Sequence, residues 1–467
     1  MHLPIEFLNS LEGIKGFSKE AFVKVHESGE QVTSIRINPF KLLNVKSVRK
    51  DSVGETSNQI SFHVSRLILQ EKIPWTDDGY YLASRPSFTF DPLFHAGCYY
   101  VQEASSMFLE QALKQTVDLS QNLKVLDLSA APGGKSTHLL SLLSKDSLLV
   151  SNEVIRSRAT ILNDNIIKWG CSNIVVTNND PKDFQQLKNY FDVIIVDAPC
   201  SGSGLFRRDP AAIEEWSEQN VIMCSQRQQR ILADVLPALK TGGVLIYSTC
   251  SYSIAEDEKI CEWIKNDLKI ANEELLINSA WHITESGGGY RFWPDKIKGE
   301  GFFLACFRKK TGDDKIDLPK VKPYAFSKQE MDVLKKYVKT NDITFLRHGK
   351  MIKAIPESLI ADIAMVSTKL RIVSCGTEIG EIIKDKLVPE HALAVSTILS
   401  DEVLRMDLNY DQAIQYLKKK DPELITERKG WAVVTCQGQG LGWINILPNR
   451  INNYYPKELR ILKDQNS

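Results

Sequence analysis

Between about residue 98 and residue 308, short apolar runs alternate with stretches whose apolar residues recur at helical spacing. The runs VLDL, LLV, IVV, VIIV and VLIY predict strands, and segments between them such as THLLSLL predict helices. Strands that alternate with helices are typical of a parallel sheet covered by helices. The sequence therefore predicts an α/β fold with a doubly wound sheet for this part of the chain.

The parts on either side follow other patterns. Residues 1–85 mix amphipathic helix signals with short strands such as TSIRINPF, which predicts a separate α+β domain. Residues 308–324 are charged and contain prolines, which is typical of a linker. The end of the chain is patterned as short strands with glycine turns. We therefore expect an N-terminal domain at 1–85, a core at 86–310, a linker with a first C-terminal domain at 311–385, and a last domain at 386–467.

The composition narrows the class of protein. A chain of 467 residues is too long for one ordinary domain, and 43% hydrophobic with 25% charged residues is typical of a globular protein. No apolar stretch approaches the roughly 18 residues of a membrane helix, and the N-terminus lacks a signal-peptide pattern, so we expect a cytoplasmic protein. The nine cysteines form no CxxC pair, which argues against a disulfide framework and against a zinc site. Net charge is zero, so a nucleic acid would have to be held by local basic patches.

The segment LDLSAAPGGKS predicts a ligand site at a strand-to-helix turn. Glycines at such a turn let a ligand approach the backbone closely, at the edge where doubly wound sheets bind ligands. The spacing fits neither a phosphate-binding P-loop nor the GxGxxG dinucleotide fingerprint. An ordinary glycine-rich turn is the alternative interpretation of this segment taken alone.

Three acids follow successive predicted strands and should lie at the same edge. They are Glu153, Asp180 and Asp197. Each acid alone is more commonly a helix N-cap or a solvated loop residue, but three in order beside the glycine turn favour a ligand site. Carboxylates can accept hydrogen bonds from a ribose, an adenine amino group or an ammonium, which describes a nucleoside with a positive amine better than a polyphosphate. S-adenosylmethionine fits this description.

Two cysteines also follow predicted strands. Cys200 lies in DAPCSGSG and Cys250 in STCSYS, each after an apolar run and among small polar residues. Two reachable thiols at two strand ends suggest one site. A free cysteine is more often a small buried hydrophobe, and that is the interpretation we favour for the remaining core cysteines: Cys98, Cys171, Cys224, Cys261 and Cys306.

The segments LDLSAAPGGKS, DAPCSGSGLFRRDP and STCSYSIAEDE together resemble the Sun/Fmu family of RNA cytosine-5 methyltransferases. TSIRINPFK, GCYYVQEASSM and RFWPDKIKGEGFFLACFRK match the same family in the same order. The C-terminal GWAVV, GQGLGW and NYYPKELR are similar to the PUA-like RNA-binding domain of its ribosomal RNA branch, the RsmF kind. The resemblance implies a Rossmann-like methyltransferase core, an RNA-facing N-terminal domain and a PUA-like last domain. Ser129 stands where the family often has cysteine, and because that position should face the cofactor through its backbone, binding should survive.

The resemblance also implies roles for the site residues. Cys250 would be the nucleophile, Cys200 would assist release, and Asp197 would lie beside the cytosine ring nitrogen and the methionine. DNA cytosine-5 methyltransferases instead use the cysteine of their Pro-Cys motif, here Cys200, and the spacing alone leaves both assignments open. The predicted cofactor-binding residues are Ser129, Ala130, Ala131, Pro132, Gly133, Gly134, Lys135, Glu153, Arg158, Asp180 and Asp197.

Basic and aromatic residues predict contacts with RNA in two places. LFRRDP follows Cys200, and GGGYRFWP combines Arg291 with Tyr290, Phe292 and Trp293, as in a groove for unpaired RNA. Ordinary strand packing is the alternative, and we favour it for Phe292 and Trp293 individually. Near the C-terminus the basic residues are Arg428, Lys429, Arg450, Lys457 and Arg460, and the aromatic residues are Trp431, Trp443, Tyr454 and Tyr455. Solvated charges on a small β-barrel are the alternative there.

Together these features predict an enzyme that uses S-adenosylmethionine to methylate carbon 5 of cytosine in RNA, with 16S ribosomal RNA as the expected substrate. A transfer RNA cytosine-5 methyltransferase with the same core is one alternative, and a non-catalytic RNA-binding ribosome-assembly factor is another. We expect a monomer with RNA as its partner, without a metal and without a membrane.

Overall fold

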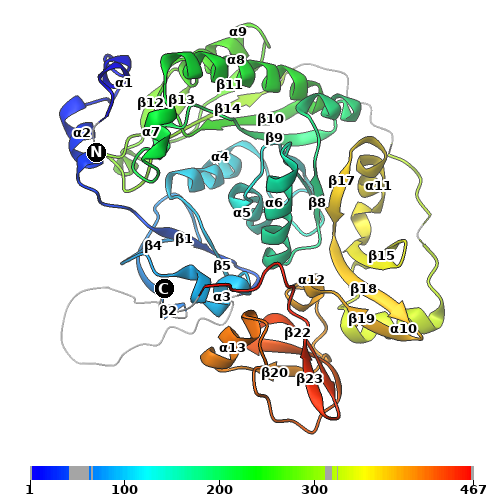
Figure 1. Ribbon diagram of the computed structural model, residues 1–467. Coiled ribbons are helices and arrows are strands. Elements are labelled where there is room, and N and C mark those ends of the chain that lie inside the picture. The colour runs from blue at the N-terminus through cyan, green and yellow to red at the C-terminus, as the bar shows by residue number, and fades with distance from the viewer. Residues whose placement is uncertain (1–2, 42–62, 65–66, 311–317, 323, 464–467) are drawn as a thin grey trace.

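The centre of the protein, seen in a computed structural model, is one long sheet with helices on both faces (Figure 1). The structure describes residues 3–41, 63–64, 67–310, 318–322 and 324–463. Across this sheet the strands run in the order β12 (Thr284–Ser286), β13 (Gly289–Phe292), β14 (Phe302–Arg308), β10 (Leu239–Thr249), β9 (Phe191–Asp197), β6 (Lys124–Asp127), β7 (Leu148–Asn152), β8 (Ile174–Thr177) and β17 (Ile372–Cys375), with β11 (Ala271–Glu273) beside β14.

From β8 to β10 the neighbouring strands are parallel, and β14 pairs with β10 in the antiparallel sense. The chain order reverses at β6, which has β7 on one side and β9 on the other. In such a sheet, ligands bind beyond the carboxyl ends of the strands at the reversal. The prediction of a doubly wound α/β core is confirmed.

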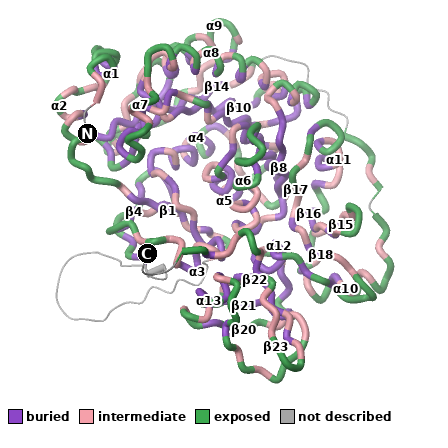
Figure 2. Tube along the Cα trace, in the orientation of Figure 1, coloured by how far each residue is buried: buried purple, intermediate pink, exposed green. Residues whose placement is uncertain are grey.

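Alternate residues along each central strand pack into cores on opposite faces of the sheet. Val125 and Val193 pack with α4 (Leu109–Thr116), α5 (Gly134–Leu142) and α6 (Arg156–Trp169). Leu126 and Ile194 pack on the other face with α8 (Glu218–Val235), α9 (Glu258–Asn266) and α11 (Ile360–Lys369). Both faces are covered, so the middle residues of these strands are apolar and the strands appear as largely buried segments in Figure 2.

The N-terminal part forms its own sheet, which extends beyond the predicted boundary at residue 85. Its order is β2 (His63–Val64), β3 (Leu67–Lys72), β4 (Gly79–Leu82), β1 (Ser34–Ile37) and β5 (Tyr99–Val101), and its helices are α1 (Ile5–Ser10), α2 (Lys19–Glu27) and α3 (Pro92–His95). Residues 42–62 of the predicted domain lie outside the described residues. β5 leads directly into η2 (Ser105–Phe108) and α4, so this sheet is continuous in the chain with the core.

The first C-terminal unit shares one strand with the core. Its sheet has the order β15 (Ile343–His348), β16 (Met351–Pro356), β18 (Thr377–Ile383) and β19 (Lys386–Pro389), with α10 (Lys328–Tyr337) against it. β17, between α11 and β18, pairs antiparallel with β8 and so covers an edge of the core sheet that would otherwise be open. The predicted boundary at 385 falls in the turn between β18 and β19, and the linker residues 311–317 and 323 lie outside the described residues.

The last unit is a sheet with the order β20 (Arg405–Asp407), β21 (Gly430–Cys436), β22 (Gln439–Leu447) and β23 (Arg450–Asn453), flanked by α12 (His391–Ala394) and α13 (Tyr410–Leu417) (Figure 1). Its apolar residues share a core with the N-terminal sheet, for example Ile444 with Ile35. Within the described ranges, the structure contains no helix that is both long enough and apolar enough to span a membrane.

Candidate active site

The two cysteines that follow β9 and β10 meet at the carboxyl edge of the sheet. The strands are parallel neighbours in a register that places Asp197 opposite Ser248, so their exits lie side by side. Cys200 Sγ and Cys250 Sγ are 3.0 Å apart, and both side chains are partly exposed. The structure thus brings together the thiols that the sequence placed fifty residues apart.

Backbone contacts hold the two loops against each other. The Gly204 N–H donates to the Cys250 carbonyl at 2.7 Å. A Cβ at Gly204 would lie 2.5 Å from that carbonyl oxygen and 2.6 Å from the Gly301 carbonyl oxygen, so the close approach requires glycine. Beneath the loops, the buried Glu256 accepts hydrogen bonds from Ser201 and Ser251, the residues that follow each cysteine. Glu256 is not among the residues predicted for the site, although it lies in the AEDE segment shortly after the second cysteine.

Asp197 and Lys135 form an ion pair beside the thiols. Lys135 Nζ lies 2.8 Å from Asp197 Oδ2, and Ser248 Oγ donates to Asp197 Oδ1 at 2.7 Å. Burial by itself would lower the pKa of Lys135, but the negative charges of Asp197, Asp127 and a Cys250 thiolate more than offset it, so the pKa is raised. Lys135 is therefore a permanent cation at this edge.

The predicted glycine turn forms one wall of a cavity of about 160 Å³. Gly133 has a φ of 114° and lies directly before α5. The carbonyl of Ala131 accepts from Arg158 at 2.9 Å, and the carbonyl of Pro132 accepts from Asn165 at 2.8 Å, which fixes the turn from α6. The cavity is lined by Ser129, Ala130, Ala131, Pro132, Gly134, Lys135 and Asp197 from the core and by Tyr100, Val101, Gln102, Glu103 and Ser106 from β5 of the N-terminal sheet and the segment that follows it.

The other two predicted acids have different environments. Glu153 is 2% exposed, and its Oε1 accepts from the Ile155 N–H at 3.0 Å. Its Oε2 is buried and has no hydrogen-bond partner among the described residues, although Arg158 lies 3.4 Å away. Asp180 is partly exposed and caps η3 (Pro181–Leu187) by accepting from the Lys182 N–H. Glu153 thus has an acceptor to offer to a ligand, whereas one oxygen of Asp180 is used locally.

Asp127, at the end of β6, is a further polar group that the sequence analysis missed. Its Oδ2 accepts from Ser136 Oγ at 2.7 Å, and its buried Oδ1 has no partner among the described residues. Burial raises the pKa of this carboxyl to about 7, against the lowering effects of Ser136 and Lys135. The sequence offered one sign of this group, an acidic residue inside the apolar run VLDL, but the run by itself predicts only a strand.

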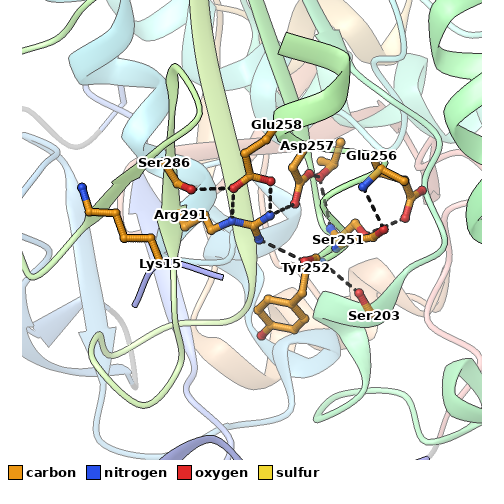
Figure 3. A network of polar contacts seen from close by, with 12 residues as sticks. Lys15, Ser203, Ser251, Tyr252, Glu256, Asp257, Glu258, Ser286 and Arg291 are labelled. Carbon is orange, nitrogen blue, oxygen red and sulfur yellow. Dashed lines mark hydrogen bonds and ion pairs between the residues drawn. The ribbon is translucent and has the colours of Figure 1, made fainter. Parts of the chain in front are cut away.

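The prediction that residues 290–293 line an RNA groove is wrong. Tyr290 is 5% exposed, Arg291 is 2% exposed, and Phe292 and Trp293 are fully buried. The Arg291 guanidinium forms ion pairs with Asp257 and Glu258 and donates to the Tyr252 carbonyl (Figure 3). This segment is a packed strand, as the alternative interpretation held.

The basic residues elsewhere divide between interior and surface. Arg207, in LFRRDP, is buried and donates to the carbonyls of Gly299 and Glu30. In the last domain, Trp443 and Tyr455 are buried, whereas Tyr454 is 44% exposed and its ring centroid lies 4.5 Å from that of Trp431. The basic residues there are exposed at Arg428, Lys429, Arg450 and Lys457 and partly exposed at Arg460.

Comparisons with known proteins agree over most of the chain. Residues 114–308 match the family model described as 16S rRNA methyltransferase RsmB/F. Residues 3–104 match the N-terminal domain of 16S rRNA methyltransferase RsmF, and residues 403–461 match the methyltransferase RsmF PUA domain.

Individual relatives extend the same similarity. The ribosomal RNA small subunit methyltransferase F of Shewanella woodyi is 33% identical over 83% of this chain and 84% of its own length. The protein of the same name from Vibrio parahaemolyticus is 32% identical over 100% of this chain and 99% of its own length. Among solved structures, a methyltransferase homolog from Pyrococcus horikoshii has a TM-score of 0.50 and 25% identity, covering 66% of this chain and 100% of that one.

Proposed function

The chain belongs to the ribosomal RNA small subunit methyltransferase F family, whose members are S-adenosylmethionine-dependent RNA methyltransferases, and on that premise we propose that it methylates carbon 5 of a cytosine in 16S ribosomal RNA. The observation that carries the proposal is the pair of thiols 3.0 Å apart beside the Lys135–Asp197 pair, which lies in the wall of the cavity at the glycine turn.

Methylation at carbon 5 of cytosine explains why the site has a nucleophilic sulfur. Carbon 5 cannot attack a methyl donor unaided, but a thiolate that adds to carbon 6 converts the ring into an enamine whose carbon 5 is nucleophilic. S-adenosylmethionine supplies the methyl group as an electrophile. A base then removes the proton from carbon 5, the bond between sulfur and carbon 6 breaks, and the thiolate is restored.

The environments of the two thiols support Cys250 as the nucleophile. A Cys250 thiolate is among the charges that raise the Lys135 pKa, so the Lys135 ammonium lies close enough to Cys250 to interact with it. The hydrogen bond with Cys250 and burial, together with the charges of Cys250 and Glu256, raise the pKa of Cys200 well above its usual range. Cys200 is therefore suited to remain a thiol while Cys250 adds, and to act in proton transfer when the adduct collapses.

The residues around the cavity fit the cofactor. Glu153 Oε2, which has no hydrogen-bond partner among the described residues, can accept from a ribose hydroxyl, and Gly134 in the cavity wall lets a ligand approach the backbone. We assign Arg158 and Asp180 to the same nucleoside end. Asp197, fixed by Ser248 and Lys135, lies where it can face both the methionine part and the target base.

Ribosomal RNA is favoured as substrate by the family and by the PUA domain at residues 403–461. The target cytosine must be unpaired or flipped, because carbon 6 of a stacked base is inaccessible to Cys250. The reaction would take place in the cytoplasm, where the ribosomal subunits are.

Bisulfite sequencing of ribosomal and transfer RNA from a deletion strain tests this proposal, since 5-methylcytosine resists deamination. We expect one or more protected cytosines in 16S RNA to become deaminated in the deletion strain and to regain protection with the wild-type gene. Loss of protection in transfer RNA alone would assign the enzyme to the other substrate. An unchanged pattern in both RNAs would contradict the proposed reaction.

A further inference from the structure

Glu256 lies where the loops of the two thiols meet. It is fully buried, and its carboxylate accepts four hydrogen bonds. Oε1 accepts from the Ser201 N–H at 2.8 Å and from Gln228 Nε2 at 3.3 Å. Oε2 accepts from Ser201 Oγ at 2.5 Å and from Ser251 Oγ at 2.6 Å, the latter drawn in Figure 3.

The directions of these hydrogen bonds indicate an ionised carboxylate. Ser251 Oγ accepts from the Ser253 N–H at 3.0 Å, so its own proton is free to point to Glu256. Four donors match the roughly four acceptor positions of a carboxylate, and a protonated acid would place a hydrogen against one of them. The pKa of Glu256 is raised, because burial outweighs the lowering effect of the hydrogen bonds from Ser201, Ser251 and Gln228.

Glu256 contacts the residue that directly follows each of the two cysteines. Ser201 directly follows Cys200, and Ser251 directly follows Cys250. One rigid carboxylate therefore fixes both loops at once, next to the backbone contact between Gly204 and Cys250. Gly202, with a φ of 75° and open space around it, directly follows Ser201, so the Glu256 contacts restrain the loop next to its most permissive residue.

We propose that Glu256 is a positioning residue that sets the separation of the two sulfur atoms and keeps a negative charge beside Cys200, which disfavours a second thiolate there. This inference rests on the proposed roles of the two thiols. The negative charge of Glu256 is one of the causes that raise the pKa of Cys200. Among the described residues, the other titratable groups that interact with the pair or its neighbours include Lys135 on α5, Asp197 on β9, Tyr247 on β10 and Cys224 on α8, and Arg227 on α8 lies near Cys224.

Two variants separate geometry from charge. Glu256→Gln keeps the shape and can hydrogen-bond to both serines, because a hydroxyl can accept as well as donate. Glu256→Ala removes both the contacts and the charge. The matched control is Glu110, a 2% exposed carboxylate on α4 that accepts from Thr76, Asp77, Lys114 and His138, away from the thiols. Glu110→Ala should lower stability while leaving the rate of the folded protein near that of the wild type.

The first measurement is single-turnover methylation of RNA with saturating cofactor, together with the Kd for S-adenosylmethionine. We expect Glu256→Ala to lower the rate by about a hundredfold, as for a reacting group displaced by about 1 Å. The Kd should stay within about twofold of the wild type. Glu256→Gln should restore the rate to within about tenfold of the wild type. A Glu256→Ala rate no lower than that of Glu110→Ala would overturn the inference.

The second measurement needs neither RNA nor cofactor. Iodoacetamide labelling of Cys200 and Cys250 is followed across pH by peptide mass spectrometry in the wild type and in Glu256→Gln. Removing an anion favours ionisation of a neighbouring thiol, so Cys200 in the variant should be labelled at lower pH than in the wild type. An unchanged Cys200 profile would overturn the inference. If wild-type protein labels as expected but methylates no RNA, the proposed function fails while the labelling still decides the role of Glu256.

Discussion

Several polar groups at the carboxyl edge of the central sheet are buried, whereas those on the surface of the last domain are exposed to solvent. At the sheet edge, Asp127, Glu153 and Glu256 are buried, and their orientations are fixed by hydrogen bonds or strand ends. In the last domain, Arg428 and Lys429 are exposed on a segment before β21. Substitutions at the edge should therefore alter the methylation rate, cofactor binding or stability, whereas substitutions at the surface should alter only the affinity for RNA.

Two clusters of arginine with aromatic residues show the same contrast. Arg291 lies in a run with three aromatic residues, but Asp257 and Glu258 neutralise it inside the protein. Arg428 and Lys429 shortly precede Trp431, whose ring contacts Tyr454, and both basic side chains are exposed. Both clusters combine basic with aromatic residues, so the sequence does not distinguish them. Burial and neighbouring carboxylates decide which cluster is available to RNA.

The largest effect is expected from the thiols at the sheet edge. Cys250→Ala should lower methylation on the order of 10³-fold or more, as when other enzymatic nucleophiles are removed, because no sulfur adds to carbon 6. Cys200→Ala should still add and transfer the methyl group but then stall, leaving a protein–RNA adduct on a denaturing gel. An adduct from Cys250→Ala and none from Cys200→Ala would reverse the assignment.

A second large effect is expected from breaking the buried ion pairs of Arg291. Arg291→Met leaves two carboxylates without their cation and should cost about 3–5 kcal/mol in the free energy of unfolding by urea. Burial already raises the pKa of Asp257 well above its usual range. The folded variant therefore binds more protons than the unfolded chain, and its stability should fall as pH rises above the usual range of aspartate. Arg428→Met, the surface control, should change the free energy of unfolding by less than about 0.5 kcal/mol. Equal losses of stability in the two variants would show that the two clusters do not differ.

The next effect in size concerns the cofactor. Glu153→Ala should weaken S-adenosylmethionine binding by roughly 1.5–3 kcal/mol, or on the order of tenfold to a hundredfold in Kd, because hydrogen bonds to a charged acceptor are lost. Isothermal titration calorimetry measures the change, and RNA affinity in the absence of cofactor serves as the control. An unchanged Kd would remove Glu153 from the site.

The smallest effect is expected from the surface of the last domain. Arg428→Ala with Lys429→Ala should weaken RNA binding several-fold and reduce the slope of log K against log salt by up to roughly 1.4, if each residue contacts one phosphate of a single strand. Cofactor affinity should not change. These substitutions are cleaner than truncation at residue 386, which would remove β19 and its Leu387 from the core shared with α10 and β15. An unaltered salt slope would make these charges ordinary solvated residues.

Much of the fold and part of the site could be predicted from periodicity. The apolar runs of β6, β9 and β10 predicted a parallel sheet, and the carboxyl ends of neighbouring parallel strands share one edge. That rule alone predicted that Cys200 and Cys250 would be close. It could not predict that β17 would join the sheet from beyond residue 310, because an edge strand accepts any segment whose backbone is free to pair.

The sequence by itself determined the strands, the glycine turn and the meeting of the two thiols, because these depend on local pattern and on the order of adjacent strands. The tertiary structure decided that Arg291 is buried against Asp257 and Glu258, that one oxygen of Asp127 has no hydrogen-bond partner within the described part of the chain, and that one carboxylate, Glu256, holds Ser201 and Ser251 together. The physical reason is that desolvation and charge pairing depend on neighbours brought together from distant parts of the chain. A residue's type states which charge it can carry, and only its surroundings decide whether that charge faces solvent, a partner or a reaction.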